Sequence, residues 1–376
     1  MKRKLLLTLI LLAAAGALLY SCGLEKPEYA DGRCVLALRA VDTSGAYTEE
    51  WRSVPNARVD VVSSSQVFKR SYTTDETGRI VIEGLASGDY FVQASMRDDS
   101  LDILFTGQQR QRLRNEDEVK DTLFMSFVPT SPIVINELYY CGCSGSTFYY
   151  YDQFIELYNS TDSTVYLDGY VVCRSQQSDV LTQEELETVD FALAYYMYRF
   201  PGTLGVTREC PIGPGEYLVL ALDAINHHNY GALCVNLLEA DYEFFNAAQN
   251  DYDNLSVPNI VPVTTVGKEF TMSLGHTAVF LATGEEYTFV EYTTSSGVSP
   301  FVQVPLSTIV DAVECAENPS PTFRRYLTLR IDAGLAGTES TKYSGRSVQR
   351  KAPGFDSNNS SFDFASPAAP TPGRGR

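Results

Sequence analysis

The sequence predicts an all-β protein of two β-sandwich domains, of which the second is larger and is interrupted by a helical insertion. Three observations support this fold class. Tyrosine and phenylalanine are abundant, with 24 and 19 copies, whereas tryptophan occurs once. Aromatic and β-branched residues recur in short runs that Gly, Pro, Asn, Asp and Ser separate, which is typical of strands and turns. The 376 residues suffice for two domains at about 100–200 residues each.

The first expected element is a signal peptide over residues 1–21. Three basic residues precede an uncharged apolar stretch over 5–20, and a serine stands directly before Cys22. This layout is typical of a lipoprotein signal, and it predicts acylation of Cys22 and attachment to a membrane. A plain secretory signal is one alternative. A membrane-spanning anchor is another, but the apolar run is shorter than the ~20 residues that a spanning helix needs. Residues 22–31 would form a polar tether.

The strongly acidic composition argues against one class of partner. The formal net charge is −18 at pH 7, with 29 basic and 47 acidic side chains. Such a chain repels phosphate backbones, and the sequence has no cluster of Lys and Arg that could neutralise several phosphates. Nucleic acid is therefore not an expected partner. The acidity fits a soluble, exposed surface and indicates nothing more specific.

Residues 32–129 are expected to form the smaller sandwich. Apolar and polar side chains alternate over 58–61 and 80–85, and turn residues follow at 73–78 and 87–89. The segment resembles the carboxypeptidase-regulatory-like, or transthyretin-like, β-sandwich domain. The motifs that carry the resemblance are Pro55-Asn56-Ala57, Thr74-Asp75 to Gly78, and Leu85 to Gly88-Asp89-Tyr90. The resemblance implies a scaffold rather than chemistry.

Residues 132–376 are expected to form the larger sandwich, because Pro129 and Pro132 interrupt any continuous sheet before them. Strand-like runs at 133–138, 154–159 and 165–172 follow in the order of a lamin-tail-like, immunoglobulin-type domain. The succession of lipobox, regulatory-like sandwich and enlarged lamin-tail-like domain resembles a Bacteroidota outer-membrane lipoprotein family of uncharacterised function. That resemblance implies a location and an architecture but no mechanism.

Two insertions enlarge this second domain. In the first, over 176–204, Thr182 and Glu185 form a capping box that predicts the start of a helix. Apolar residues then recur at helical spacing and are expected to pack in the core, with a docking face as the alternative; they are Leu186, Val189, Leu193, Met197 and Phe200. The second insertion, over 226–268, is rich in Asn, Asp and Tyr. It predicts long loops, which on a rigid sandwich often carry binding sites.

The eight cysteines of an exported chain favour disulfides. Cys22 is assigned to lipid, and Cys34 stands alone in the first domain. The candidates for disulfides are Cys141, Cys143, Cys173, Cys210, Cys234 and Cys315. The sequence does not choose among their many pairings. A metal site at Cys141 and Cys143 is the alternative, although no second close pair of cysteines follows.

Metal-ligating side chains occur in the second insertion and just before it, but their spacing matches no common metal motif. His227 and His228 are adjacent and follow Asp223, and imidazole with carboxylate suits zinc. Adjacent side chains of an extended segment point to opposite faces, however. Asp251 and Asp253 offer oxygen ligands without the pattern of a calcium loop. No cofactor is predicted, Ca²⁺ stays a candidate ion, and Asp223, His227, Asp251 and Asp253 are weak metal candidates.

Tyrosines occur in two doublets and one triplet, Tyr149 to Tyr151. Consecutive strand residues alternate between faces, so each cluster is expected to turn at least one ring outward. Exposed tyrosines favour stacking on glycans or contacts with proteins. The candidate ligand-binding residues are therefore Tyr149, Tyr150, Tyr151, His227 and His228, with ordinary core packing as the alternative.

The sequence contains no nucleophile elbow, zinc-protease helix or phosphate-binding glycine loop, so no enzyme is predicted. Glu137 and Glu156 lie in strand patterns and are expected to be structural. The leading hypothesis is a lipid-anchored, non-enzymatic outer-membrane protein that binds a nutrient, a glycan or peptide, or a receptor. The family resemblance implies partnership with a TonB-dependent uptake receptor. The alternatives are an adhesin or structural surface protein, and a metal-dependent hydrolase that uses Asp223 and His227.

Overall fold

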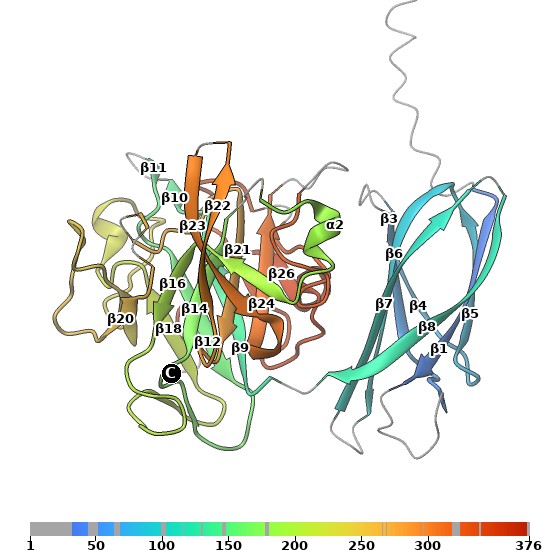
Figure 1. Ribbon diagram of the computed structural model, residues 1–376, viewed down its shortest axis with the longest axis horizontal. Coiled ribbons are helices and arrows are strands. Elements are labelled where there is room, and N and C mark those ends of the chain that lie inside the picture. Colours follow the sequence, from blue (N-terminus) through green and yellow to red (C-terminus); the bar gives the residue numbers. More distant parts are fainter. Residues whose placement is uncertain are drawn as a thin grey trace, which may run out of the picture. The chain divides into compact units, whose positions relative to one another are not determined.

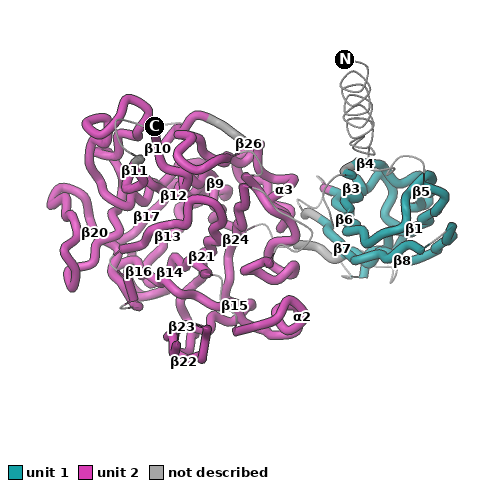
Figure 2. Tube along the Cα trace, turned by 90° about the horizontal axis from the view of Figure 1, so that it is seen from above, with its two compact units in different colours: residues 1–96, 105–126 teal, residues 97–104, 127–376 magenta. Residues whose placement is uncertain are grey.

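The computed structural model shows an all-β protein, as the sequence predicts. The chain divides into two compact units, residues 1–96 with 105–126 and residues 97–104 with 127–376 (Figure 2). The predicted signal peptide, the tether and Cys22 lie outside the described residues. The described residues are 32–43, 52–63, 68–98, 103–114, 116–128, 131–144, 148–176, 180–264, 266–267, 269–295, 297–317, 324–337 and 340–373.

The first unit is a small β-sandwich, which confirms the fold class predicted for this segment. Its strands are β1 (Cys34–Asp42), β2 (Arg52–Ser53), β3 (Arg58–Ser63), β4 (Lys69–Thr73), β5 (Arg79–Leu85), β6 (Gly88–Asp98), β7 (Ile103–Leu113) and β8 (Glu118–Val128). The strand order is β2-β1-β8-β7-β6-β3-β4, and β5 also pairs with β1. Alternating apolar residues, among them Leu36, Leu38, Val59 and Val61, are buried between the layers.

The second unit holds the remaining strands. They are β9 (Ile133–Tyr139), β10 (Cys143–Ser144), β11 (Phe148–Tyr149), β12 (Phe154–Asn159), β13 (Val165–Tyr166), β14 (Val171–Ser175), β15 (Phe191–Ala194), β16 (Tyr196–Arg199), β17 (Pro211–Ile212), β18 (Tyr217–Ala221), β19 (Tyr242–Phe244), β20 (Asn259–Pro262), β21 (His276–Ala282), β22 (Thr288–Thr294), β23 (Gly297–Pro305), β24 (Ile309–Ala316), β25 (Ser347–Arg350) and β26 (Phe364–Ala368). The short helical turns are α2 (Gln183–Leu186), η1 (His227–Asn229), η2 (Leu306–Thr308) and α3 (Ser360–Asp363).

An eleven-stranded sheet dominates this unit, in the order β24-β21-β14-β16-β20-β19-β18-β12-β9-β25-β26. The sheet curls so that β24, at one edge, lies against β9 (Figure 1). A buried ion pair joins the two ends of the curl, because Arg350 Nη2 lies 2.9 Å from Asp311 Oδ2. All seven residues of β9 are buried, since both faces of the strand are covered.

The C-terminal segment is held by two buried carboxylates of this sheet. Glu137 accepts hydrogen bonds from the backbone N and the Oγ1 of Thr371, at 3.1 and 2.9 Å. Glu156 accepts one from the backbone N of Gly373, at 2.6 Å. Both side chains are fully buried, so these donors compensate for their desolvation. This arrangement gives the two residues a structural role.

The helix predicted for the first insertion is wrong beyond its first turn. The capping box forms as predicted, with Glu185 N donating to Thr182 Oγ1 and Thr182 N to Glu185 Oε2. The helix nevertheless ends at Leu186, and two strands follow. Strand β15 pairs with β23, and β16 pairs with β14 and β20. Of the apolar residues predicted as a helical stripe, Leu193 and Met197 therefore fall on strands β15 and β16, because pairing with distant segments overrides the local periodicity.

One expectation about the tyrosine doublets is also wrong. Tyr139 and Tyr140 are both fully buried, so this doublet turns no ring outward. Tyr139 ends a strand whose two faces are covered, and alternation of side chains then exposes neither residue.

No helix among the described residues has the length and apolar content needed to cross a membrane.

Candidate functional site

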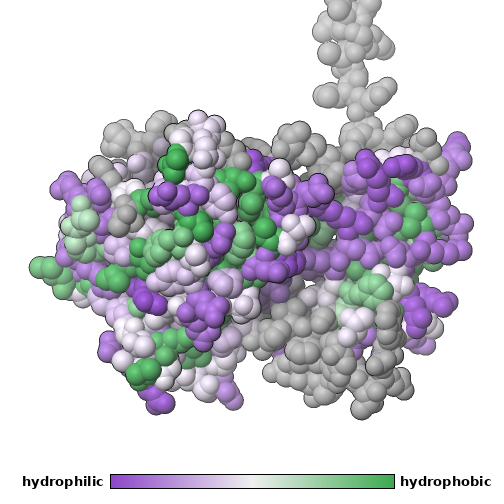
Figure 3. All heavy atoms as spheres, in the orientation of Figure 1, coloured by the Kyte–Doolittle hydropathy of each residue, from purple (hydrophilic) through white to green (hydrophobic). Residues whose placement is uncertain are grey.

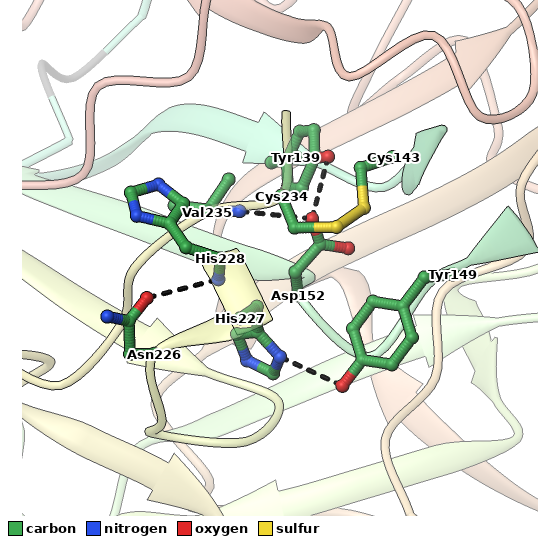
Figure 4. Close-up of a disulfide and its surroundings, with 9 residues drawn as sticks. All are labelled: Tyr139, Cys143, Tyr149, Asp152, Asn226, His227, His228, Cys234 and Val235. Atoms are coloured by element: carbon green, nitrogen blue, oxygen red, sulfur yellow. Dashed lines mark hydrogen bonds between the residues drawn. A yellow bond between two sulfur atoms is a disulfide. The ribbon is translucent and has the colours of Figure 1, made fainter. Parts of the chain in front are cut away.

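A disulfide fixes the candidate site to the sheet. Cys143 of β10 is bonded to Cys234, 91 residues further along the chain, with the two Cα atoms 5.1 Å apart. Cys234 lies in the second insertion, just after η1 (Figure 4). The bond therefore ties the loop of η1 to the short hairpin of β10 and β11.

The other four candidate cysteines are not disulfide-bonded, which differs from the expectation. Each is a buried thiol within the second unit. Cys173 and Cys315 lie inside strands of the curled sheet, and burial raises the pKa of both. The thiol of Cys141 donates to the carbonyl of Ser340, at 3.4 Å. These residues act as small apolar side chains of the core.

Tyr149 is the centre of the candidate site. Its ring stacks on that of Tyr230, with centroids 4.5 Å apart and planes 8° from parallel. Its hydroxyl lies 2.9 Å from Nδ1 of His227 (Figure 4). Burial is the first cause that raises the pKa of Tyr149, followed by the negative charge of Asp223. The disulfide and this hydrogen bond hold β11 and the η1 loop together, so the stacked pair is preorganised.

Two further rings extend the stack. Tyr150 and Tyr151 stack with centroids 4.6 Å apart, and Tyr151 lies 5.6 Å from Tyr149. We call Tyr149, Tyr150, Tyr151 and Tyr230 the tyrosine cluster. Three of these residues are half-buried and Tyr230 is 46% exposed. The rings therefore reach solvent while their positions are fixed by one another.

The two candidate histidines, His227 and His228, lie in different environments. His227 is fully buried, and its Nε2 lies 2.9 Å from the carbonyl oxygen of Asp223 while its Nδ1 meets Tyr149. Burial lowers the pKa of His227 to about 4, so the ring is neutral at pH 7. Both ring nitrogens are thus engaged, and neither is available to a metal ion. His228 is exposed, and its ring points away from Tyr149 (Figure 4).

A buried carboxylate supports the η1 loop. Asp152 Oδ2 accepts hydrogen bonds from the hydroxyl of Tyr139, at 2.9 Å, and from the backbone N of Val235, at 3.2 Å (Figure 4). Val235 follows the disulfide-bonded Cys234 directly. Burial raises the pKa of Asp152 to about 6. No sequence feature indicates this role, because Tyr139, Asp152 and Val235 share no local motif.

Acidic side chains converge next to the tyrosine cluster. Asp223, Asp251 and Glu269 each bring one carboxylate oxygen within 4.8 Å of the other two. Burial, followed by the charges of Glu269, Asp251 and Glu243, raises the pKa of Asp223 to about 8. The sequence predicted Asp223 and Asp251 as weak metal candidates but not Glu269, which lies just after the second insertion. Asp253 is not in this group, and its Oδ1 accepts from Asn259 Nδ2 at 3.0 Å.

The second insertion also exposes apolar side chains. Among the described residues of the second unit, six of the nine exposed large hydrophobic side chains belong to 226–268; they are Tyr230, Leu233, Leu238, Tyr252, Leu255 and Val261. Hydrophobic residues are visible on the surface of the second unit in the region of β20 (Figure 3). Apolar surface concentrated in one loop region is typical of a binding surface.

A separate cavity of about 420 Å³ lies near the start of β9 and β24. Two charged residues of its lining are already paired within the protein. Asp311 is bonded to the buried Arg350, and Arg330 Nη1 lies 2.8 Å from Asp190 Oδ1. The tyrosine cluster lies beyond the other end of β9. Because the tyrosine cluster combines preorganised rings with exposure to solvent, it is a better candidate site than the cavity.

The comparisons with known proteins agree with this architecture. Residues 213–371 match the DUF4876 family of unknown function. A crystal structure of a DUF4876 family protein from Bacteroides thetaiotaomicron is similar, with a TM-score of 0.58 at 20% sequence identity. The match covers 91% of this chain and 97% of that chain. At this identity the likeness shows the fold alone. The matched region includes η1 and the three clustered acidic residues but not Tyr149 to Tyr151.

Two weaker likenesses involve proteins proposed to bind carbohydrate. The one from Pseudomonas aeruginosa has a TM-score of 0.22 and 15% identity, over 26% of this chain and 92% of that chain. The one from Bacteroides uniformis has a TM-score of 0.18 and 10% identity, over 51% of this chain and 100% of that chain. TM-scores this low carry no functional argument. A search of curated proteins returned no match.

Proposed function

We propose that this chain is a lipid-anchored, non-enzymatic protein of the outer membrane that binds a glycan or a peptide through the tyrosine cluster. It would serve as a binding or accessory component of nutrient uptake, with a TonB-dependent receptor as its partner. The observation that carries the proposal is the stacked pair Tyr149 and Tyr230, which is partly exposed and held by a disulfide.

Aromatic rings suit both ligand classes. A tyrosine offers a flat apolar face for stacking and a hydroxyl for hydrogen bonding. Rings that are fixed before binding lose little conformational entropy when a ligand arrives. Tyr149 is held by stacking, by its hydrogen bond to His227 and by the nearby disulfide. The exposed apolar residues of the second insertion would extend the contact surface.

Binding is favoured over catalysis because two reactive groups beside the rings, His227 and Asp152, are already engaged in hydrogen bonds. The two ring nitrogens of His227 are hydrogen-bonded, Nδ1 to the hydroxyl of Tyr149 and Nε2 to the carbonyl of Asp223. One oxygen of Asp152 accepts from Tyr139 and Val235. A hydrolase would need one of these groups to reach a substrate within hydrogen-bond distance.

The ligand site is tested by substituting two members of the cluster that reach solvent. The purified chain is screened against immobilised polysaccharides and peptides, and the tightest binder is then measured by calorimetry. Tyr230→Ala and Tyr150→Ala should each weaken binding about tenfold without lowering the melting temperature. Phe289→Ala is the matched control, because Phe289 is 59% exposed in the second unit but lies outside both the cluster and the second insertion. Equal affinity in all four proteins would refute the assignment.

The anchor and the partner are tested separately in cells. Cys22→Ser should abolish labelling with palmitate and should release the protein from the membrane fraction. A variant that still sediments with membranes and still incorporates palmitate would overturn the lipid anchor. Affinity purification of the wild-type protein from outer membranes should recover a TonB-dependent receptor. Self-association without a receptor would instead favour an adhesin.

A further inference from the structure

We propose that Asp223, Asp251 and Glu269 form a calcium-binding site next to the tyrosine cluster. The three carboxylates come from three separate segments of the second unit. Asp223 follows β18, Asp251 lies between β19 and β20, and Glu269 precedes β21. One oxygen of each lies within 4.8 Å of the other two. Folding therefore brings three acidic groups to one point.

A second observation indicates that this point is built for a cation. Asp223 is only 8% exposed, and its Oδ1 is buried and accepts no hydrogen bond from any described residue. A buried carboxylate oxygen without a donor is costly, and such oxygens are normally compensated by a hydrogen bond or an ion. The neighbouring Asp251 and Glu269 are acidic and add repulsion rather than compensation. A bound cation would satisfy Asp223 and remove the repulsion.

The donor set favours Ca²⁺, and its dimensions are compatible with that ion. All three ligands are carboxylate oxygens, which Ca²⁺ prefers, whereas zinc sites normally include histidine or cysteine. Two oxygens that bind one Ca²⁺ at about 2.4 Å can be at most about 4.8 Å apart. The separation within the cluster fits this limit.

The surrounding backbone already orients one ligand. Asp251 Oδ2 accepts from the backbone N of Asn246 at 2.8 Å, and its Oδ1 accepts from the backbone N of Tyr252 at 2.9 Å. Hydrogen bonds of this kind fix ligating carboxylates in metal sites. A Ca²⁺ ion here would join the loop between β19 and β20 to the ends of two sheet segments. The site would thus order part of the second insertion whether or not the tyrosine cluster binds a ligand.

The test measures calcium binding directly. The full chain is stripped with EDTA and titrated with CaCl₂ by calorimetry, and one Ca²⁺ per chain is expected. Tb³⁺, which replaces Ca²⁺, should show luminescence excited through tyrosine. Energy transfer needs a ring near the ion, and Tyr149 and Tyr151 are close enough to Asp223 for its charge to act on both hydroxyls. Added Ca²⁺ should quench that emission. Asp251→Asn and Glu269→Gln should each weaken Ca²⁺ binding at least tenfold.

Two controls separate loss of ligands from loss of fold. Asp253→Asn changes a nearby carboxylate outside the cluster and should bind Ca²⁺ as the wild type does. Glu269→Gln without metal should melt no lower than metal-free wild type, because the substitution removes a repelling charge. Absence of Ca²⁺ binding to the wild type would overturn the proposal. So would equal losses in Asp253→Asn and Glu269→Gln, or binding of Zn²⁺ without Ca²⁺.

Discussion

The disulfide between Cys143 and Cys234 should be the largest single covalent contribution to the stability of the second unit. Replacing both residues with serine opens a loop of 91 residues in the unfolded chain. The loop-entropy relation gives a loss of about 15.5 cal/mol/K, or about 4.6 kcal/mol at 25 °C. At about 2–4 °C per kcal/mol for a domain of this size, the melting temperature should fall by about 9–18 °C.

The assay is thermal unfolding followed by near-ultraviolet circular dichroism, which reports on the buried tyrosines of the second unit. Wild-type protein in reductant should melt like the double serine variant. A denatured, unreduced sample should also give five reactive thiols besides Cys22, because five of the seven cysteines beyond residue 31 are free. Seven thiols would show that the bond does not form.

Cys141→Ser is the matched control, because Cys141 lies two residues from Cys143 and is a buried thiol. It should lower the melting temperature far less than the double substitution does. If the double variant loses less than about 1 kcal/mol, the entropic argument is wrong for this loop. The same result would remove the claim that the bond preorganises the tyrosine cluster.

Three other substitutions test the packing of the second unit. Arg350→Met leaves the buried Asp311 without its ion-pair partner and should destabilise the unit by about 3–5 kcal/mol in urea unfolding. Asp152→Asn removes a carboxyl whose pKa burial raises from its ordinary value of 3.8 to about 6 in the folded protein. The stability that Asp152 contributes is present below pH 4 and is lost as the pH rises through 6. The variant should therefore gain about 2.4 kcal/mol relative to wild type between pH 4 and pH 7, and a constant difference would contradict this. Gly142→Ala places a Cβ 2.4 Å from the carbonyl oxygen of Tyr149 at a φ of 71°, and should cost about 1–3 kcal/mol and weaken ligand binding. Normal melting and binding in that variant would exclude strain at Gly142.

The all-β class was predictable because it rests on composition and on short alternating runs, which are local. The failure of the long helix shows the limit of such signals. The capping box of Thr182 and Glu185 forms, yet the chain after Leu186 joins strands that lie far away in sequence. A single sequence shows periodicity but not the partner of a strand. The wrong expectation that one ring of Tyr139 and Tyr140 is exposed has the same cause. The curled sheet covers both faces of β9, and strand alternation in the sequence does not show this.

The candidate site was only partly predictable, for a related reason. Tyr149 and His227 stand out as residue types in loops, but their contact joins positions 78 residues apart. Tyr230 and Glu269 were not predicted, although both are adjacent to predicted residues in space. One belongs to an Asn- and Tyr-rich loop and the other follows it, and neither is part of a motif. Their grouping follows from the fold of the second insertion.

The hydrogen bonds that Thr371 and Gly373 donate to Glu137 and Glu156 have a consequence for when the second unit can fold during synthesis. These carboxylates lie near the beginning of the second unit, while their donors lie at its very end. A nascent chain still inside the ribosome would keep both acids without those donors. The first unit, complete by residue 126, can fold during translation. The second unit can complete these hydrogen bonds only after Thr371 and Gly373 have been synthesised, long after the carboxylates that accept them.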